Sequence, residues 1–477
     1  MLTHKTGLVF AVGLMLAGCN LAPKYVRTGL PVPTQSPVGP AYGANVNGNA
    51  PASVSADTAW QSFFTDDRLR RAIHTALVNN RDLRISVANV EQARALYRVQ
   101  RADLFPTLGG TGSATYAKSP FAATGGTGTG TTVSGRSDVY AANLGISAWE
   151  IDLFGRIRNL TKAQQEQYFA AAENRDAAQS ALIAEIATAW LTMAADQDRL
   201  LIARNTEKAF GETVKLTEAR FRIGIASELE VRQARTTYDQ ARSDIANAIT
   251  LIAQDQNALN LLAGTTLPGN MLPARLPETG TTLANLPANL PSEVLLRRPD
   301  VAAAEHQLIA ANANIGAARA AFFPNISLTA ALGTVSLGLS NLFASGSGNW
   351  SVAPSITQPL FDFGRNKGNL RYAKATRDAQ LSTYERSIQS AFREVADALA
   401  RRGTITSQVE AQTSLRNNAA AAYRLSDLRF RAGVDPFLTT LDAQRQFYTA
   451  QQSLLAVRLT RETNSVELYR ALGGGLQ

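Results

Sequence analysis

The sequence predicts a mixed membrane α/β protein with an internal two-fold repeat. Three observations support this fold class: a duplicated order of short phrases, alternating apolar positions in two short regions, and heptad patterns over long helical segments. Each half is expected to supply one β-hairpin to a barrel shared among several chains. The long helices of each half are expected to continue that barrel as a coiled-coil tunnel.

The repeat is visible in phrases that recur at nearly constant separation. A segment that ends in Phe-Pro, residues 82–106, recurs as residues 300–324, at a separation of 218 (300 minus 82). The phrase Arg-Phe-Arg-X-Gly at 220–224 recurs at 429–433, at a separation of 209 (429 minus 220). Because solenoid units are far shorter than this, we expect two pseudo-equivalent halves of one assembly.

The N-terminus predicts export. Residues 1–18 contain a short positive region and nine apolar residues, 8–16, too few to span a bilayer, so they are expected to be a signal peptide. The Leu-Ala-Gly-Cys run that ends at Cys19 resembles a bacterial lipoprotein cleavage box. Cys19, the only cysteine, is therefore predicted to be lipidated, with palmitate among its acyl chains, and Asn20 after it indicates the outer membrane. Residues 19–65 are expected to form an extended, lipidated segment.

Composition disfavours several classes of function. The net charge is +9, but basic residues form no long run and no cluster of stacking aromatic residues accompanies them, so no nucleic-acid partner is expected. The three histidines, His4, His74 and His306, are isolated, and no nucleophile elbow or phosphate loop is present. We therefore expect no enzyme activity, no metal site and no cofactor beyond the lipid on Cys19.

Two regions predict β-hairpins, one at about 107–149 and one at about 325–360. In each, apolar residues alternate with small polar residues over runs of about ten, the length of a transmembrane strand. Ordinary half-buried strands alternate in the same way, so the matching positions in the two halves carry the prediction. Pro354 is unfavourable for regular strand pairing.

The rest of each half predicts helices, with a first repeat at 66–263 and a second at 292–472. A proline-rich equatorial connector at 264–291 joins them, and residues 473–477 form a tail. Apolar heptads recur over about 60 residues in each half, which is typical of coiled-coil packing. In the first half they include Val231, Ala234, Tyr238, Ala241, Ile245, Ala248 and Ile252.

Four strands are too few to close a barrel, and unpaired strand edges are not tolerated in lipid. The chain is therefore expected to oligomerise, although its composition does not set the number of copies.

The duplicated halves, the long heptad helices, the run Leu290–Val301 and the segment Gly433–Arg445 resemble the outer-membrane efflux protein family, the TolC-like channel-tunnels. The chain is similar to their lipoprotein branch, the OprM-like or NodT-type factors. The resemblance implies a homotrimer with a 12-stranded β-barrel, four strands per chain, and a periplasmic helical tunnel. It also implies a periplasmic adaptor (membrane fusion protein) and an inner-membrane RND-type pump as partners, with export of drugs or other toxic small molecules and multidrug resistance as the role.

The resemblance assigns site residues at the helical tips. Adaptor docking falls on Gly224, Ile225, Gly433 and Val434. The periplasmic aperture gate falls on Asp442, Glu230, Phe430 and Asp435. Phe430 stands where the family often has Tyr, Asp435 where it has Arg, and Thr439 where it has a second Asp, so the interhelical latch of the family is in doubt in this chain.

Two alternatives remain open at this stage. The outer-membrane component of a type I protein-secretion system shares the fold. A non-transport trimeric coiled-coil scaffold, such as an adhesin, would also combine heptads with a small barrel, but it predicts one barrel segment at a chain end. Two hairpins at matching places of a duplication favour the channel.

Overall fold

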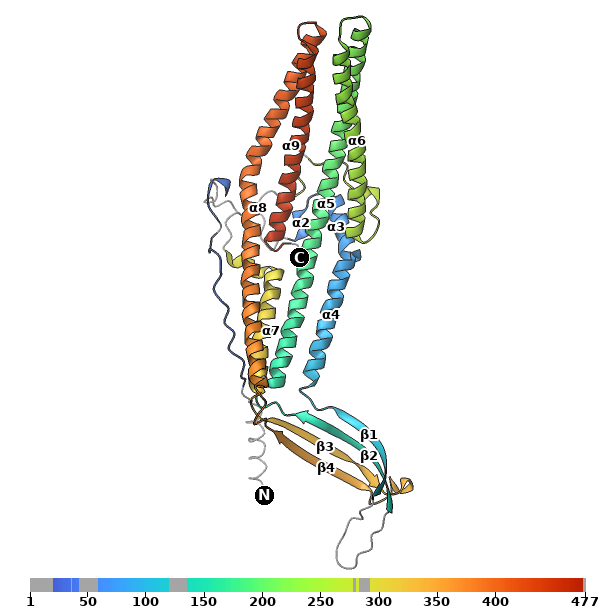
Figure 1. Cartoon of the computed structure of the whole chain (residues 1–477), viewed down its shortest axis with the longest axis vertical. Helices are drawn as coiled ribbons and strands as arrows, with labels where there is room; N and C mark the ends of the chain where they lie inside the picture. The colour runs from blue at the N-terminus through green and yellow to red at the C-terminus, as the bar shows by residue number, and fades with distance from the viewer. Residues whose placement is uncertain are drawn as a thin grey trace, which may run out of the picture. The chain divides into compact units, whose positions relative to one another are not determined.

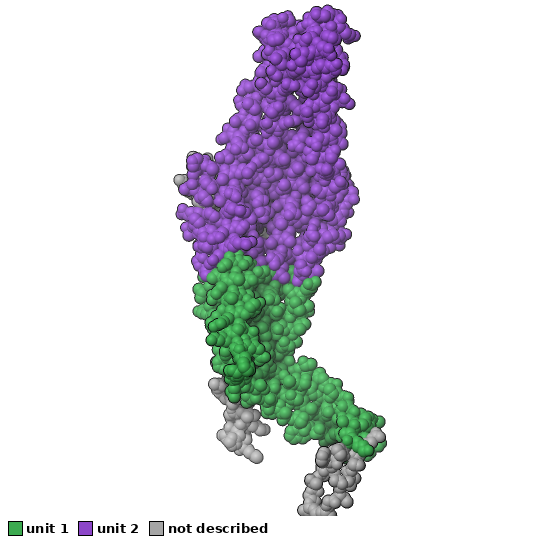
Figure 2. All heavy atoms as spheres, viewed as in Figure 1, with its two compact units in different colours: residues 1–27, 90–170, 304–383 green, residues 28–89, 171–303, 384–477 purple. Residues whose placement is uncertain are grey.

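The computed structural model describes residues 20–35, 37–42, 59–119, 135–277, 280–282 and 292–474. The predicted signal peptide and Cys19 lie outside the described residues, as do residues 283–291. The chain divides into two compact units (Figure 2). Unit 1 contains residues 1–27, 90–170 and 304–383, and unit 2 contains residues 28–89, 171–303 and 384–477.

Unit 1 contains a four-stranded antiparallel sheet in the order β1-β2-β3-β4 (Figure 1). The strands are β1 (Leu108–Ser119), β2 (Gly135–Glu150), β3 (Asn325–Ser336) and β4 (Gly348–Thr357). The two hairpins predicted from alternation are thus present, and β2 joins one to the other by pairing with β3. Strands β1 and β4 form the two edges of this sheet.

The register of the sheet places the apolar positions of all four strands on one face. Leu144 of β2 lies opposite Leu332 of β3, and Leu332 lies opposite Trp350 of β4. Successive side chains of a strand point to opposite faces, so this register makes the apolar face continuous. Leu332 is 67% exposed and Trp350 is 74% exposed, so the described residues leave this face uncovered.

The pairing of β2 with β3 is interrupted at one place, which the sequence did not mark. The alternation in β2 stops at a bulge between Ile146 and Trp149, where Ala148 has φ +49°. A bulge places an extra residue in one strand and shifts the side-chain pattern, which explains why the alternation does not continue through Ala148. Pro354 pairs with Leu328 and is tolerated because β4 is an edge strand.

Helices make up most of the rest of the described chain. They are α2 (Trp60–Phe63), α3 (Asp67–Asn79), α4 (Arg81–Ala102), α5 (Arg156–Arg222), α6 (Glu228–Ala263), α7 (Pro299–Ala320), α8 (Arg365–Arg431) and α9 (Phe437–Ala471). Helices α5 and α8 are each 67 residues long. Among the described residues, no helix has the length and apolar content that a membrane span requires.

The main hydrophobic core lies in unit 2. It joins α2 and α3 to the middle of α5, the end of α6 and the end of α9. Phe63 stacks on Tyr469 with ring centroids 4.0 Å apart. Trp190 is fully buried, and its indole Nε1 donates a hydrogen bond to the carbonyl of Met271 at 2.9 Å. The start of the connector is therefore anchored to this core.

The N-terminal segment, predicted to be extended, docks on helices of unit 1. The carbonyl of Leu21 accepts from Arg319, and the carbonyl of Pro23 accepts from Asn312. Tyr25 and Arg27 both bond the carboxylate of Glu305, the latter through two hydrogen bonds of 2.7 Å. The segment therefore lies along α7 and is held by side chains 278 to 298 residues away in the sequence.

We expect Gly264→Ala to destabilise the protein by more than about 1 kcal/mol, because Gly264 closes α6 with φ +66°. A Cβ at this position would lie 2.3 Å from the carbonyl oxygen of Asn79. The matched control is Gly269→Ala, where a Cβ would meet nothing within 4 Å. Thermal unfolding followed by circular dichroism measures both, and equal midpoints in the two variants would contradict this account.

Candidate functional site

The candidate site is the pair of tips where α5 turns into α6 and α8 turns into α9, at the top of Figure 1. Gly224 and Gly433 have φ +77° and +75°. In both turns the next amide reaches back five residues: Ile225 N donates to Arg220 O, and Val434 N donates to Arg429 O, each at 2.9 Å. This left-handed glycine closure ends the long helices at matching positions.

Each tip presents aliphatic side chains to solvent. Ile225 and Val434, predicted to dock the adaptor, are both 63% exposed. Ile223 and Leu229 flank the first turn, Leu438 follows the second, and all three are exposed. Exposed apolar residues gathered on a turn are typical of a protein contact site.

A small hydrophobic cluster holds the two hairpins together behind the tips. Its buried members are Ala234 of α6, Phe430 of α8 and Phe437 and Leu441 of α9. Phe430 is only 3% exposed, and its ring lies 5.6 Å from that of Phe437. In this chain Phe430 is therefore a packing residue between the hairpins, and its predicted gating role would have to act through that packing.

Arg220 reaches from the first hairpin to this cluster. Its guanidinium carbon lies 4.7 Å from the centroid of the Phe430 ring. A cation over an aromatic face is attracted by the ring quadrupole, and the attraction strengthens where water is excluded. The contact joins α5 to α8 without a carboxylate partner at the ring.

Asp435 forms an ion pair with Arg429 inside the second tip. Its carboxylate accepts two hydrogen bonds from Arg429, at 2.7 and 2.8 Å. These bonds and the positive charge of Arg429 lower the pKa of Asp435. Arg429 corresponds to Arg220 of the first half. The residue corresponding to Asp435 is Ala226, so Arg220 cannot form the equivalent ion pair in its own tip.

Asp442 and Glu230 lie farther along the returning helices. Asp442, on the second turn of α9, has 55% of its side chain exposed, and its carboxylate lies 4.0 Å from Arg445. Glu230 lies in the first turn of α6, where its amide donates to Ser227, the helix cap. Among the described residues the structure gives no direct contact between these two carboxylates, and their gating roles stay predictions.

The sequence analysis did not identify a carboxylate pair on the α5/α6 hairpin. Asp196 is buried and forms an ion pair with Arg199. Asp255 faces Asp196 and has one buried carboxylate oxygen without a hydrogen-bond partner. Burial and the charge of Asp196 raise the pKa of Asp255 to about 6. Two aspartates 59 positions apart (255 minus 196) on antiparallel helices leave no local sequence signal.

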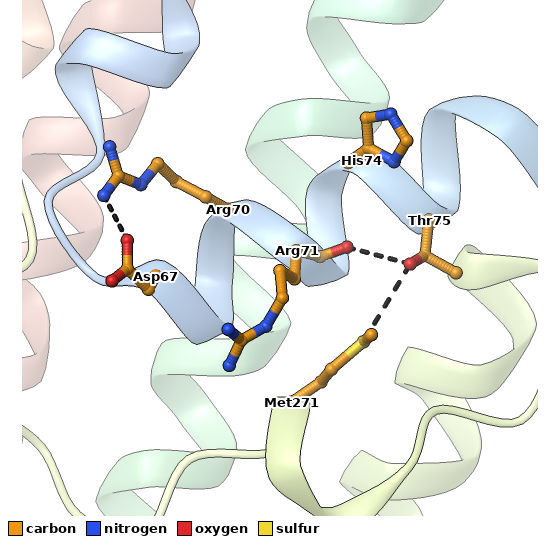
Figure 3. A pocket seen from close by; sticks show the side chains of 6 residues that line it. All are labelled: Asp67, Arg70, Arg71, His74, Thr75 and Met271. Atoms are coloured by element: carbon orange, nitrogen blue, oxygen red, sulfur yellow. Dashed lines mark hydrogen bonds and ion pairs between the residues drawn. The ribbon is translucent and has the colours of Figure 1, made fainter.

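A shallow pocket lies between α3 and the connector, and Figure 3 shows its lining residues. Arg70 pairs with Asp67, and Arg71 donates to the carbonyl of Asn270 at 3.3 Å. Thr75 bonds the Arg71 carbonyl at 2.8 Å and lies 3.9 Å from the sulfur of Met271. These contacts fasten the connector to α3 and engage the side chains of Asp67, Arg70, Arg71 and Thr75.

This architecture, a sheet with one exposed apolar face together with long helical hairpins ending in apolar tips, defines a channel-type transport protein of a membrane. The chain belongs to the outer membrane efflux protein family, whose model matches residues 72–265 and 290–474. It is an outer-membrane efflux channel protein, so the predictions of family, transport role and outer-membrane location are confirmed.

Relatives of known name cover almost the whole chain. The toluene efflux pump outer membrane protein TtgC of Pseudomonas putida is 45% identical over 463 residues, covering 97% of this chain and 93% of the relative. The cation efflux system protein CusC of Escherichia coli is 38% identical and covers 98% of each chain. The solved open state of the Neisseria gonorrhoeae MtrE outer membrane channel has a TM-score of 0.84 and 38% identity, covering 96% of this chain and 99% of that one.

We predict that Asp255→Asn stabilises the protein at pH 8 by about 1 kcal/mol, a value reduced for screening of this half-buried carboxyl. The pKa of Asp255 is about 6 in the folded chain, against about 3.9 when unfolded. Protonation therefore stabilises the fold as the pH falls from about 7 to 4, and that contribution is lost as the pH rises through 6. The amide stays uncharged at every pH.

Thermal unfolding of wild type and Asp255→Asn between pH 4.5 and 8 measures this effect. The gain should be largest at pH 8 and vanish near pH 4.5. Asp239→Asn is the matched control, because Asp239 is an exposed carboxylate paired with Arg242 on the same helix. A gain that does not change with pH would show that Asp255 does not titrate in this range.

Proposed function

We propose that the protein is a homotrimer that forms the outer-membrane channel of a tripartite efflux system. The sheet supports this most directly: it has one continuous apolar face and two open edges, β1 and β4. Exposed edges are not tolerated in lipid, and four strands cannot close on themselves. Three copies would supply the twelve strands of a closed barrel, with the apolar face toward lipid and the polar face toward a water-filled lumen.

A periplasmic adaptor and an inner-membrane RND-type pump complete the proposed system. The tips supply the adaptor contact through Ile225 and Val434, with the glycine turns setting their position. The channel itself would be passive, with energy provided by the pump. The lipid on Cys19 would anchor the chain to the outer membrane. Residues 21–27, which follow it, dock along α7 of the sheet-bearing unit.

The proposed cargo is small toxic molecules such as aromatic solvents and drugs, since relatives include a toluene efflux protein. A cation efflux protein is also a relative. One fold thus serves chemically different cargo, which fits a duct whose selectivity lies in its pump. Among the described residues, no group of three or more potential metal ligands is brought together.

Asp442 is the proposed gate of the periplasmic aperture. Threefold symmetry would form a ring of three carboxylates from this exposed side chain. Such rings favour cations and narrow the path. The nearby Arg445 is 4.0 Å away, too far for a strong hydrogen bond, so the charge of Asp442 stays available to the lumen.

Asp442→Asn is expected to raise the single-channel conductance in planar bilayers and to reduce cation preference, because the amide removes the ring of charge at nearly constant size. Asp239→Asn serves as the matched control, since Asp239 is equally exposed and has an arginine three residues on. Identical conductance and selectivity in wild type and Asp442→Asn would rule out Asp442 as the gate. A stable channel in both would still support the proposed duct.

The lipid-facing assignment is tested by a pair of neighbouring substitutions in β4. Val352→Arg places a charge on the apolar face and should cost about 2–4 kcal/mol near the bilayer midplane, lowering the yield of membrane-assembled protein. Ser351→Arg places the same charge on the opposite face and should assemble like wild type. Membrane fractionation and heat-modifiable migration report assembly, and equal loss in both variants would contradict the assignment.

A further inference from the structure

Helices α4 and α7 occupy equivalent places in the two halves of the sequence, but their surroundings differ. Helix α7 is buried along most of its length, including Leu308 and Ile315. No residue of α4 is buried, and it exposes the apolar side chains of Leu96 and Val99. Within the described part of the chain, one face of α4 therefore lacks the neighbour that its counterpart α7 has.

The N-terminal parts of α5 and α8 show the same contrast. Ala163 of α5 is 2% exposed and packs on Ala310 and Ala313 of α7. Its counterpart 209 residues later is Tyr372 of α8, which is exposed. The open faces thus belong to α4 and α8, the helices that adjoin the two edge strands β1 and β4 in the chain.

An aromatic contact inside the chain joins its two halves next to the sheet. Phe154, between β2 and α5, stacks on Phe323, between α7 and β3, with ring centroids 4.7 Å apart and an interplanar angle of 19°. These rings lie at the junctions that adjoin the pairing of β2 with β3. The stack thus joins the β2–α5 junction of the first half to the α7–β3 junction of the second half.

The counterparts of these two rings are both exposed. Phe363, 209 positions after Phe154, lies between β4 and α8 and is 91% exposed. Phe105, 218 positions before Phe323, lies between α4 and β1 and is 63% exposed. Phe363 also has φ +53°, a conformation that is costly for a residue with a side chain. An exposed ring presented by a strained backbone is unusual unless another surface receives it.

We propose that Phe363 stacks on Phe105 of the partner subunit, so that the internal contact between Phe154 and Phe323 is repeated between chains. The inference rests on the proposed homo-oligomer and specifies how its copies recognise one another. Phe361, whose ring lies 4.5 Å from that of Phe363, widens the aromatic surface that Phe363 presents. The same operation pairs β4 with β1 of the partner subunit and brings the open face of α8 to that of α4.

This contact is heterologous: the surface at β4 and α8 meets a different surface, at β1 and α4, on the next copy. Heterologous contacts close into a ring when the rotation between copies allows it. The aromatic stack then fixes the order of the edges and contributes specific geometry as well as apolar burial. Edge pairing alone lacks such specificity, since backbone hydrogen bonds do not depend on the side chain.

The test uses two differently tagged full-length chains expressed together in cells, one carrying Phe105→Cys and the other Phe363→Cys. A short bismaleimide is applied to isolated outer membranes, and the products are separated under denaturing conditions. We expect a cross-link between the two tags at least about tenfold faster than in the control, because adjacent thiols react at a millimolar effective concentration. Neither chain should cross-link to its own kind.

The matched control pairs Phe105→Cys with Phe343→Cys, because Phe343 is an equally exposed phenylalanine in the connection between β3 and β4, at the other end of that hairpin. Native mass of the purified protein reports the number of copies separately. An assembled oligomer that cross-links no faster than the control would overturn this inference while leaving the proposed channel intact. A monomer in the membrane would overturn both.

Discussion

The constraint on which the rest of the structure depends is that backbone N–H and C=O groups must be hydrogen-bonded wherever water is absent. Strands β2 and β3 are each paired on both sides, whereas β1 and β4, the edges of the described sheet, are each paired on one side only. The apolar face across all four strands gives this sheet a preference for lipid that a single chain cannot satisfy. The proposed shared barrel would pair these two edges. The same proposed oligomer would cover the open face of α4 and the exposed ring of Phe363.

The packing of the long helices varies along their length. The main core gathers around Trp190, Phe63 and Tyr469, where short helices and the connector pack against the long ones. Away from this level the long helices have small knobs such as Ala234 and Ala241, which allow close approach but bury little area. Long hairpins of this kind are stabilised by neighbours along their whole length, and in the proposed homo-oligomer a second copy would supply further neighbours.

The two tips have the same backbone turn but different side-chain contacts. Both end in a glycine turn with the same hydrogen bonds, so their backbone is equivalent. Their charges are not: Arg429 is held by Asp435 within its own tip, whereas Arg220 lies over Phe430 of the other hairpin. The first tip has Ala226 where the second has Asp435. Arg220 therefore has no carboxylate at that position and contacts the ring of Phe430 on the other hairpin. The two hairpins are thus joined near their tips by a contact between a cation and the ring of Phe430, the position where the family resemblance implies a tyrosine.

The sequence by itself determined the local structure and the duplication. Alternation located the strands, Phe-Pro phrases and glycines marked where helices end, and heptads predicted the long hairpins, because these signals depend on residues close together in the chain. Only the tertiary structure decided which distant residues meet. Phe154 stacks on Phe323, Asp255 faces Asp196, and Glu305 receives Tyr25 and Arg27. Such pairs leave no periodic trace, since each depends on how helices and strands far apart in sequence are brought side by side. The bulge after Ile146 was hidden for a related reason: it is a property of the pairing between two strands and not of either strand alone.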